Sequence, residues 1–201
     1  MTAGETRQEG LRERTRRAVR AEIAGTAMRL FLDRGYEATT MDEIARRVGI
    51  SRRSLFHYFG SKEDIVLGDH AERGEIVRAA LESRPAEEDP WTAIRASLKA
   101  LIDTLPYSSE EFLRISRLLK QSPALRARHV EKNQQWIDLL VPCLTARLAG
   151  TSPDPFVELR AGAIIAAAIS CLDVASETWV SSDGRLDMEM LYDEAVAAVR
   201  H

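Results

Sequence analysis

The stretch from Thr40 to Tyr58, TMDEIARRVGISRRSLFHY, decides the fold. Thr40 and Glu43 have the spacing of a capping box, so a helix is expected to begin directly after Thr40. Gly49 allows a sharp turn, and Ser51 can cap a second helix of about eight residues that ends near Tyr58. A helix, a glycine-containing turn and a second short helix are the pattern of a helix-turn-helix.

The second helix of this motif is expected to have one apolar and one polar face. Leu55 and Phe59 are four residues apart and therefore lie on the same side, where they can pack inward, whereas Phe56 lies beside them and can pack either way. The opposite face offers two guanidinium groups, a hydroxyl, an imidazole and a phenol, which suit phosphate oxygens and base edges in the major groove. These candidate DNA-binding residues are Arg52, Arg53, Ser54, His57 and Tyr58.

The charge of the chain is unevenly distributed. Residues 1–60 contain 12 arginines, no lysine and 8 acidic residues, a net charge of +4, although the whole chain has a net charge of −3. A basic first third on an acidic remainder suits a protein whose N-terminal part faces a polyanion. A solvated helix face would account for the same charges, so the charge alone leaves both interpretations open.

The rest of the chain is expected to be helical. No stretch has the alternating β-branched pattern of a strand, and proline and glycine interrupt the sequence at regular intervals. We predict an all-α protein of about nine helices, with a DNA-binding domain of three helices over residues 1–60 and a helical bundle over 61–201. A helix over 61–83 would connect the two. The other helices are expected at about 12–34, 40–48, 51–58, 90–104, between Pro106 and Pro123, at 123–148 with a kink at Pro142, at 156–181 after Pro153, and after Gly184.

The segment from Phe31 to Lys62 resembles the N-terminal domain of the TetR family of repressors. The resemblance covers residues 15–65 and implies that DNA is contacted by Thr40, by the five recognition-helix residues given above and by Lys62. The motifs that carry it are Phe31, Gly35-Tyr36, Ala38-Thr39-Thr40, Ile44-Ala45, Val48-Gly49-Ile50-Ser51, Leu55, Tyr58-Phe59 and Ser61-Lys62-Glu63.

The chemistry of these residues agrees with such contacts. Thr40 and Lys62 are expected at helix N-termini, where free N–H groups favour phosphate. Arg52 and Arg53 can each pair with O6 and N7 of guanine, and the recognition helix has no Asn or Gln to read adenine, so we expect a G·C-biased half-site. Many family members have tyrosine where this chain has Phe56, and a phosphate contact from that hydroxyl would be missing here.

The resemblance also implies a ligand cavity and a dimer interface in the C-terminal region. The helix over 156–181 is rich in Ala, Gly and Ser, which lets another helix approach closely, although these residues could also pack within one chain. We expect a homodimer through the last two helices, with Trp179 and Leu191 as anchors.

Apolar stripes on three helices are candidates for the cavity, although such stripes are also typical of an ordinary core. Polar groups nearby, Arg117, His129, Gln135 and Asp173, would orient a bound molecule. The apolar bias favours a hydrophobic effector, such as a fatty acyl or aromatic compound. The candidate pocket residues are Phe112, Ile115, Leu119, Trp136, Leu140, Cys143, Ile169 and Leu172.

These observations predict a cytoplasmic transcriptional regulator, in particular a repressor that a small effector releases from a palindromic DNA operator. The longest apolar run, Ala161–Leu172, is too short to span a membrane, and no apolar signal core occurs at the N-terminus. Cys143 and Cys171 lie in apolar surroundings without C-x-x-C spacing, so both are expected to be reduced.

The sequence disfavours one other class of function and leaves a second one open. An enzyme is disfavoured because H-E-x-x-H, a glycine-rich phosphate loop and G-x-S-x-G are all missing from the sequence; catalytic residues, metal and cofactor are therefore not expected. A helical adaptor that binds another protein through the hairpin remains possible. Steep salt dependence of binding would distinguish DNA from a mainly apolar protein partner.

Overall fold

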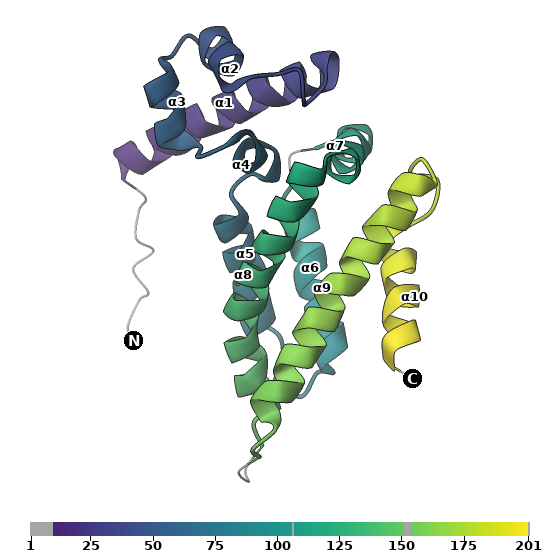
Figure 1. The fold of residues 1–201 in the computed structure, drawn as a ribbon. Coiled ribbons are helices and arrows are strands. Elements are labelled where there is room, and N and C mark those ends of the chain that lie inside the picture. Colours follow the sequence, from purple (N-terminus) through teal and green to yellow (C-terminus); the bar gives the residue numbers. More distant parts are fainter. Residues whose placement is uncertain (1–9, 106, 151–153, 201) are drawn as a thin grey trace. The chain divides into compact units, whose positions relative to one another are not determined.

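The computed structural model describes residues 10–105, 107–150 and 154–200, and within these ranges every regular element is a helix (Figure 1). The predicted all-α class is confirmed. Pro106 and Pro153, which were expected to end and to open helices, lie outside the described residues. The helices are α1 (Leu11–Arg34), α2 (Met41–Val48), α3 (Arg52–Tyr58), α4 (Lys62–Leu67), α5 (His70–Glu82), α6 (Pro90–Ile102), α7 (Ser109–Gln121), α8 (Pro123–Leu148), α9 (Val157–Ser181) and α10 (Met188–Arg200).

The helix predicted over 61–83 is interrupted, and this is a correction to the sequence analysis. Gly68 has φ +68° and ψ −157°, a backbone conformation that favours glycine, and it ends α4. Asp69 then caps a new helix, because its carboxylate accepts a hydrogen bond of 3.1 Å from the backbone N–H of Glu72. If α4 and α5 are counted as one interrupted helix, the described helices follow the predicted order of nine.

The same break separates two compact units, Met1–Gly68 and Asp69–His201. The division therefore falls at Gly68 rather than at residue 60, because α4 packs against α1. Ile65, Val66 and Leu67 of α4 are buried, and their burial ties this helix to the first unit.

The first unit is built around α1, which contacts α2 and α4, while α2 contacts α3. Each helix contributes buried apolar side chains on one face, as expected for amphipathic helices around a shared core. Thr39 fixes the connection between α1 and α2, because its buried hydroxyl donates to the carbonyl of Gly35 at 2.9 Å. The core includes Ile23, Ala27, Phe31, Ile44, Leu55, Phe59 and Ile65.

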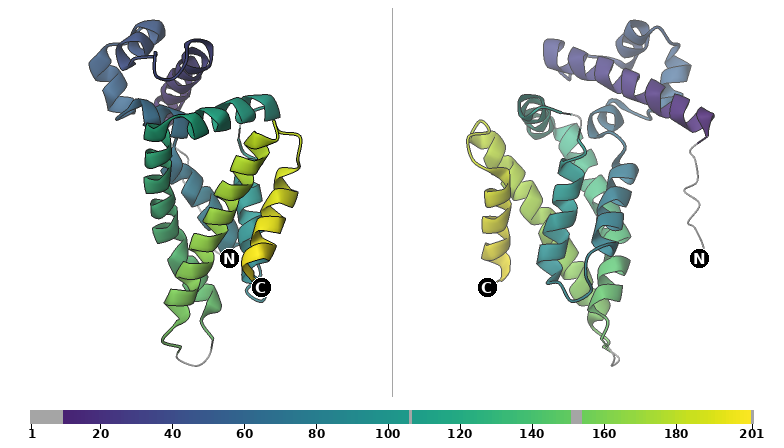
Figure 2. Two further views of the ribbon diagram at one scale, coloured as in Figure 1. Left: turned by 45° about the vertical axis from the view of Figure 1, so that its right-hand side comes forward. Right: turned by 180° about the vertical axis from the view of Figure 1, so that it is seen from behind.

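The second unit is a helical bundle in which α8 and α9 lie side by side, α10 packs on α9, and α5 packs on α6 and α8 (Figure 2). The shorter α7 crosses near one end of α8 and α9 and contacts both. Helix α8 continues through Pro142. The central buried side chains include Val77, Leu81, Ile94, Leu98, Trp136, Leu140, Leu144, Ile165, Ile169 and Tyr192.

Helix α9 corrects the expectation that no segment is long enough to span a membrane. Its 25 residues are apolar enough to cross a bilayer by length and composition alone. Packing against α6, α7, α8 and α10 is typical of the core helix of a helical bundle, which satisfies the same criteria. One third of its most apolar window is buried, so much of this helix stays uncovered.

Candidate nucleic-acid interface

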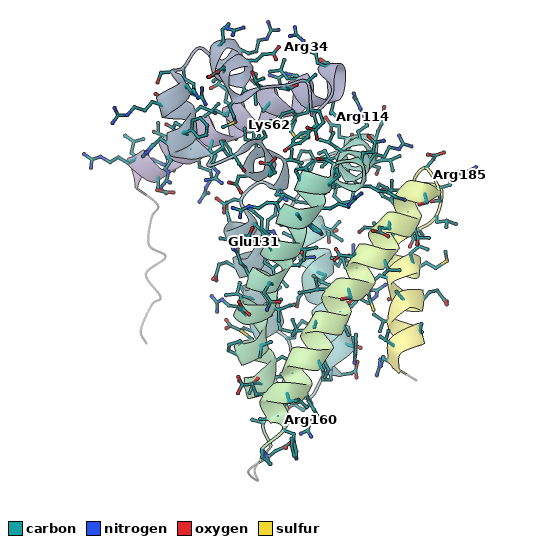
Figure 3. All side chains as sticks on the ribbon, viewed as in Figure 1. Arg34, Lys62, Arg114, Glu131, Arg160 and Arg185 are labelled. Carbon is teal, nitrogen blue, oxygen red and sulfur yellow. The ribbon has the colours of Figure 1, made fainter. Side chains whose placement is uncertain are left out.

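The N-terminus of α2 is capped by Thr40, as the sequence predicts. Its hydroxyl accepts a hydrogen bond of 3.2 Å from the backbone N–H of Glu43. The carboxylate of Glu43 accepts a hydrogen bond from the guanidinium of Arg34 at the end of α1, in place of the reciprocal bond of a capping box. Arg34 is labelled in Figure 3. The cap of α2 is therefore tied to α1, which fixes where the helix-turn-helix begins.

The turn between α2 and α3 has the predicted glycine geometry. Gly49 has φ +82° and ψ +27°, the left-handed conformation that few other residues adopt without strain. The backbone N–H groups of Gly49 and Ile50 both donate to the carbonyl of Ala45 at 3.0 Å. Ser51 then caps α3, since its hydroxyl accepts from the backbone N–H of Ser54 at 3.0 Å. Local hydrogen bonds thus set the angle at which α3 leaves α2.

The recognition helix α3 has the predicted division into two faces. Leu55 and Phe59 are fully buried, whereas Phe56 is 41% exposed and lies on the outer side. The predicted DNA-binding residues are outward-facing, with Tyr58 half-buried and the others exposed: Arg52, Arg53, Ser54 and His57.

The two arginines at the start of α3 have different surroundings. Arg52 Nη1 lies 3.3 Å from Oδ2 of Asp42 in α2, and its guanidinium lies 5.4 Å from the centroid of the Phe56 ring. Arg53 is exposed and makes no hydrogen bond or ion pair within the described part of the chain. Asp42 was missed by the sequence analysis, because only the geometry of the turn brings it to Arg52.

The other polar side chains of α3 make short local contacts. The hydroxyls of Ser54 and Ser51 lie 2.8 Å apart, so Ser54 shares its hydrogen-bonding capacity with the helix cap. The rings of His57 and Tyr58 meet edge to face with centroids 5.7 Å apart. This contact joins the two rings along α3.

Lys62, expected to contact phosphate, is also bound within its own unit. Its ammonium donates to the carbonyl of Tyr36 at 3.0 Å and lies 4.3 Å from the centroid of the Tyr36 ring. The Tyr36 hydroxyl in turn donates to Glu63 at 2.5 Å. Burial and this bond raise the pKa of Tyr36 far above its usual value, so the phenol stays protonated. Lys62 keeps donors for a second partner, because an ammonium has three.

The eight candidate pocket residues of the second unit do not form a single group. Trp136, Leu140 and Ile169 are buried in the bundle core, with Cys143 and Leu172 packed against it. The three candidates from α7 are not part of this cluster of described residues: Phe112, Ile115 and Leu119. The Phe112 ring instead contacts Trp179, with centroids 5.6 Å apart.

The polar residues expected to orient a ligand are also in different places. His129 and Asp173 are bonded at 2.9 Å between α8 and α9, and Asn133 donates to the same carboxylate at 2.8 Å. Arg117 pairs with Asp183 at 2.7 Å. Gln135 is exposed, so it does not line the core.

Comparisons with known proteins assign both parts of the chain to one family. The family described as "Bacterial regulatory proteins, tetR family" matches residues 23–68, and the "MftR C-terminal domain" matches residues 88–201. The HTH-type transcriptional regulator TcmR of Streptomyces glaucescens is 29% identical over 199 residues, which are 95% of this chain and 87% of that protein. The HTH-type transcriptional repressor AcnR of Corynebacterium glutamicum is 30% identical over 172 residues, 79% of this chain and 91% of that one.

A solved structure has the same fold. The FadR repressor of Thermus thermophilus, crystallised with lauroyl-CoA, superposes with a TM-score of 0.54 at 23% identity, covering 89% of this chain and 91% of that one. The family and curated-protein matches, together with the helix-turn-helix geometry, assign the molecule to DNA-binding regulators rather than enzymes. The chain belongs to the TetR family of transcriptional regulators.

Proposed function

We propose that this protein is a homodimeric, cytoplasmic repressor that binds a palindromic operator through α3 and is released by a small hydrophobic effector. The observation that carries the proposal is the exposed polar face of α3, opposite the buried Leu55 and Phe59. A short helix with one face fixed in a core and guanidinium, hydroxyl and imidazole groups on the other fits the major groove.

Different DNA-binding roles are proposed for different residues. Arg53 reads a base edge, because its guanidinium is exposed and unpaired in the described part of the chain. Arg52 reads a neighbouring guanine while Asp42 limits its range of orientations. Thr40 and Lys62 contact phosphates, and the remaining DNA-facing side chains are Ser54, His57 and Tyr58. Because α3 has two arginines and no amide side chain, it favours G·C pairs.

The proposed dimer interface uses the uncovered face of α9 together with α10. Four uncharged exposed residues recur along α9 at helical spacing and lie on one face, which also carries the exposed Glu177. Two such faces can pack closely as a four-helix bundle and place two recognition helices about 34–36 Å apart. Trp179 offers little surface for this interface because it is buried within its own unit. The exposed face comprises Leu159, Ala163, Ser170 and Val174.

The proposed effector site lies in the apolar interior of the second unit. Trp136, Leu140 and Ile169 supply apolar surface there, and Cys143 and Leu172 border it; Phe112, Ile115 and Leu119 of α7 would close one end. The lauroyl-CoA bound by the T. thermophilus relative fits a hydrophobic ligand for this chain. An effector that binds the DNA-incompetent state more tightly shifts the population away from the operator.

Selection of bound sequences from a random DNA pool, followed by titration of the selected site at two salt concentrations, tests the proposal. A palindromic, G·C-biased site whose affinity falls steeply with salt is the expected result, because arginine and lysine displace counterions from phosphate. Lack of enrichment, with weak binding indifferent to sequence, would refute it and would favour a protein-binding adaptor.

A further inference from the structure

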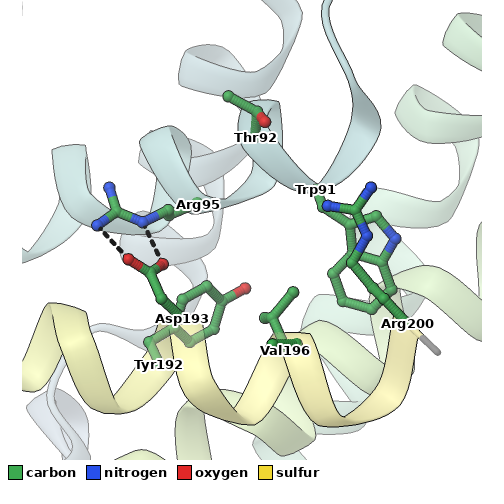
Figure 4. Close-up of a pocket in the computed structure, with 8 residues that line it drawn as sticks. Trp91, Thr92, Arg95, Tyr192, Asp193, Val196 and Arg200 are labelled. Carbon is green, nitrogen blue, oxygen red and sulfur yellow. Dashed lines mark hydrogen bonds and ion pairs between the residues drawn. The ribbon is translucent and has the colours of Figure 1, made fainter.

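A pocket of about 240 Å³ lies between α6 and α10 in the second unit (Figure 4). None of the residues proposed for the hydrophobic effector lines it. Trp91 and Arg95 contribute from α6, and Tyr192, Val196 and Arg200 contribute from α10. A dry cavity of about 150 Å³ can hold benzene, so this pocket has room for one ring with polar substituents.

Tyr192 brings an unsatisfied hydroxyl to this pocket. Its side chain is 95% buried, since only 5% is exposed, and its hydroxyl has no hydrogen-bond partner within the described residues. In Figure 4 the hydroxyl points away from α10 towards the space between the two helices; its oxygen has almost no accessible surface, so a ligand oxygen reaches it by displacing a neighbouring side chain. Burial raises the pKa of Tyr192, so the phenol remains a neutral donor. A buried donor without a partner costs free energy, which a ligand oxygen would recover.

The two arginines of the pocket differ in how many of their N–H groups already have a hydrogen-bond partner. The Arg95 guanidinium donates two hydrogen bonds to the carboxylate of Asp193, at 2.5 Å from Nε and at 2.9 Å from Nη2. Arg200 makes a single bond of 3.2 Å to Asp89, and its guanidinium lies 5.9 Å from the centroid of the Trp91 ring. A guanidinium has five N–H donors, so Arg200 retains donors for an anion.

The order of these groups along α10 specifies the shape of a ligand. Tyr192, Val196 and Arg200 are spaced four residues apart, so they lie on one face over about 12 Å of helix. A donor therefore lies at each end, with an apolar side chain between them. The lining residues include two arginines and one aspartate, and outside the lining Arg95 also pairs with Glu189 and Arg200 with Asp89.

We propose that this pocket is a second ligand site, which binds a small planar aromatic carboxylate. Its ring packs on Val196 and Trp91, its carboxylate accepts from Arg200, and an oxygen at the opposite end accepts from Tyr192. The pocket differs from the proposed effector site in its lining residues, and a compound bound here contacts both α6 and α10. Its binding does not depend on whether the protein recognises an operator.

Isothermal titration of the full chain with 4-hydroxybenzoate, benzoate and 4-hydroxybenzamide tests this site. We expect saturable binding of one 4-hydroxybenzoate per chain and affinity at least about tenfold lower for the uncharged amide, because a charge-assisted bond is lost. Arg200→Gln is expected to weaken both carboxylates by about the same factor. The control, Arg114→Gln, removes an exposed arginine on α7 and is expected to change nothing (Figure 3).

Tyr192→Phe provides a separate test that does not depend on charge. The variant removes a hydroxyl that has no partner in the described structure, so its thermal midpoint without ligand is expected to stay equal or rise. It is also expected to abolish the preference for 4-hydroxybenzoate over benzoate. The proposal is overturned if neither acid binds the wild-type protein saturably, or if Arg200→Gln and Tyr192→Phe both leave the affinities unchanged.

Discussion

The imidazole of His70 lies almost flat on the indole of Trp136, with ring centroids 4.5 Å apart and an angle of 20° between the planes. Trp136 Nε1 donates to the backbone carbonyl of His70 at 2.9 Å. His70 Nε2 lies 2.7 Å from the carbonyl of Lys132, and because a carbonyl only accepts, this nitrogen carries the proton. Together these contacts attach the first residue of α5, directly after the Gly68 break, to α8.

The burial of His70 predicts a loss of stability in mild acid. Burial lowers the pKa of His70 to about 4, whereas the pKa in an unfolded chain is about 6.5. The unfolded state therefore takes up the proton first, and stability falls as the pH decreases from about 6.5 towards 4. We expect the free energy of unfolding to fall by about 2 kcal/mol between pH 7.5 and pH 5, measured by urea denaturation.

His70→Gln is the matched variant, because an amide can still donate to the Lys132 carbonyl but does not titrate. This variant is expected to lose most of the difference in stability between the two pH values. His129→Gln, which removes another imidazole that pairs with Asp173, should retain the difference. An unchanged pH dependence in His70→Gln would show that another group is responsible.

Gly74 lies at a second close contact between α5 and α8, where a larger residue is expected to destabilise the fold. A Cβ at this position would lie 2.9 Å from Leu139 Cδ2 and 3.0 Å from Trp136 Nε1, so the helices would have to separate. Overpacking costs about 1–3 kcal/mol, which exceeds the roughly 1 kcal/mol that alanine gains over glycine in a helix. We expect Gly74→Ala to lower the free energy of unfolding, by up to about 2 kcal/mol in urea.

Gly162→Ala is the control for this substitution within the same unit. Nothing lies within 4 Å of a Cβ at Gly162 in α9, so only the gain in helix propensity remains. This variant is expected to gain up to about 1 kcal/mol. Equal effects of the two substitutions would contradict a tight contact at Gly74.

Local signals in the sequence were sufficient to predict most of the fold. Thr40, Gly49 and Ser51 act through hydrogen bonds and backbone angles within a few residues, and each has the predicted role. Gly68 was missed because a glycine inside an apolar pattern is compatible with a continuous helix. The break lets α4 pack on α1 in the first unit while α5 packs in the second, a tertiary requirement that local sequence does not reveal.

The candidate sites were harder to predict from the sequence, because they also depend on tertiary packing. The outward face of α3 follows from helical periodicity, but the pairing of Asp42 with Arg52 depends on the angle between two helices. The predicted cavity residues were chosen by apolar stripes, which do not distinguish a core from a pocket. The α6–α10 pocket joins Trp91 to Tyr192, about a hundred residues apart, and no spacing rule connects them.

The different surroundings of Arg52 and Arg53 predict different effects on DNA binding. Arg53→Ala is expected to weaken binding to the selected operator by about 1–3 kcal/mol and to relax the sequence preference at one base pair. Asp42→Asn removes a carboxylate that pairs with Arg52, so it is expected to tighten binding to unrelated DNA. Fluorescence anisotropy on the selected and a scrambled duplex measures both.

Arg114→Ala is the control for these DNA-binding variants, because it removes an exposed positive charge from α7 in the other unit. Its affinity for either duplex should match that of the wild type. If Arg53→Ala weakened both duplexes equally, Arg53 would be a phosphate contact rather than a base contact.

The exposed face of α9 predicts the oligomeric state. Val174 is 57% exposed in the middle of this face, and a charge there would be buried against a second subunit. An unpaired buried charge is strongly unfavourable, so Val174→Glu is expected to shift the protein from dimer to monomer in sedimentation equilibrium. Val130→Glu introduces the same charge at a 66% exposed site on α8 and should leave the dimer intact.

Because a monomer contacts only half of a palindrome, Val174→Glu is also expected to lose most of its operator affinity while keeping its helical content. A wild-type monomer would refute the dimer, and a Val174→Glu dimer would place the interface elsewhere.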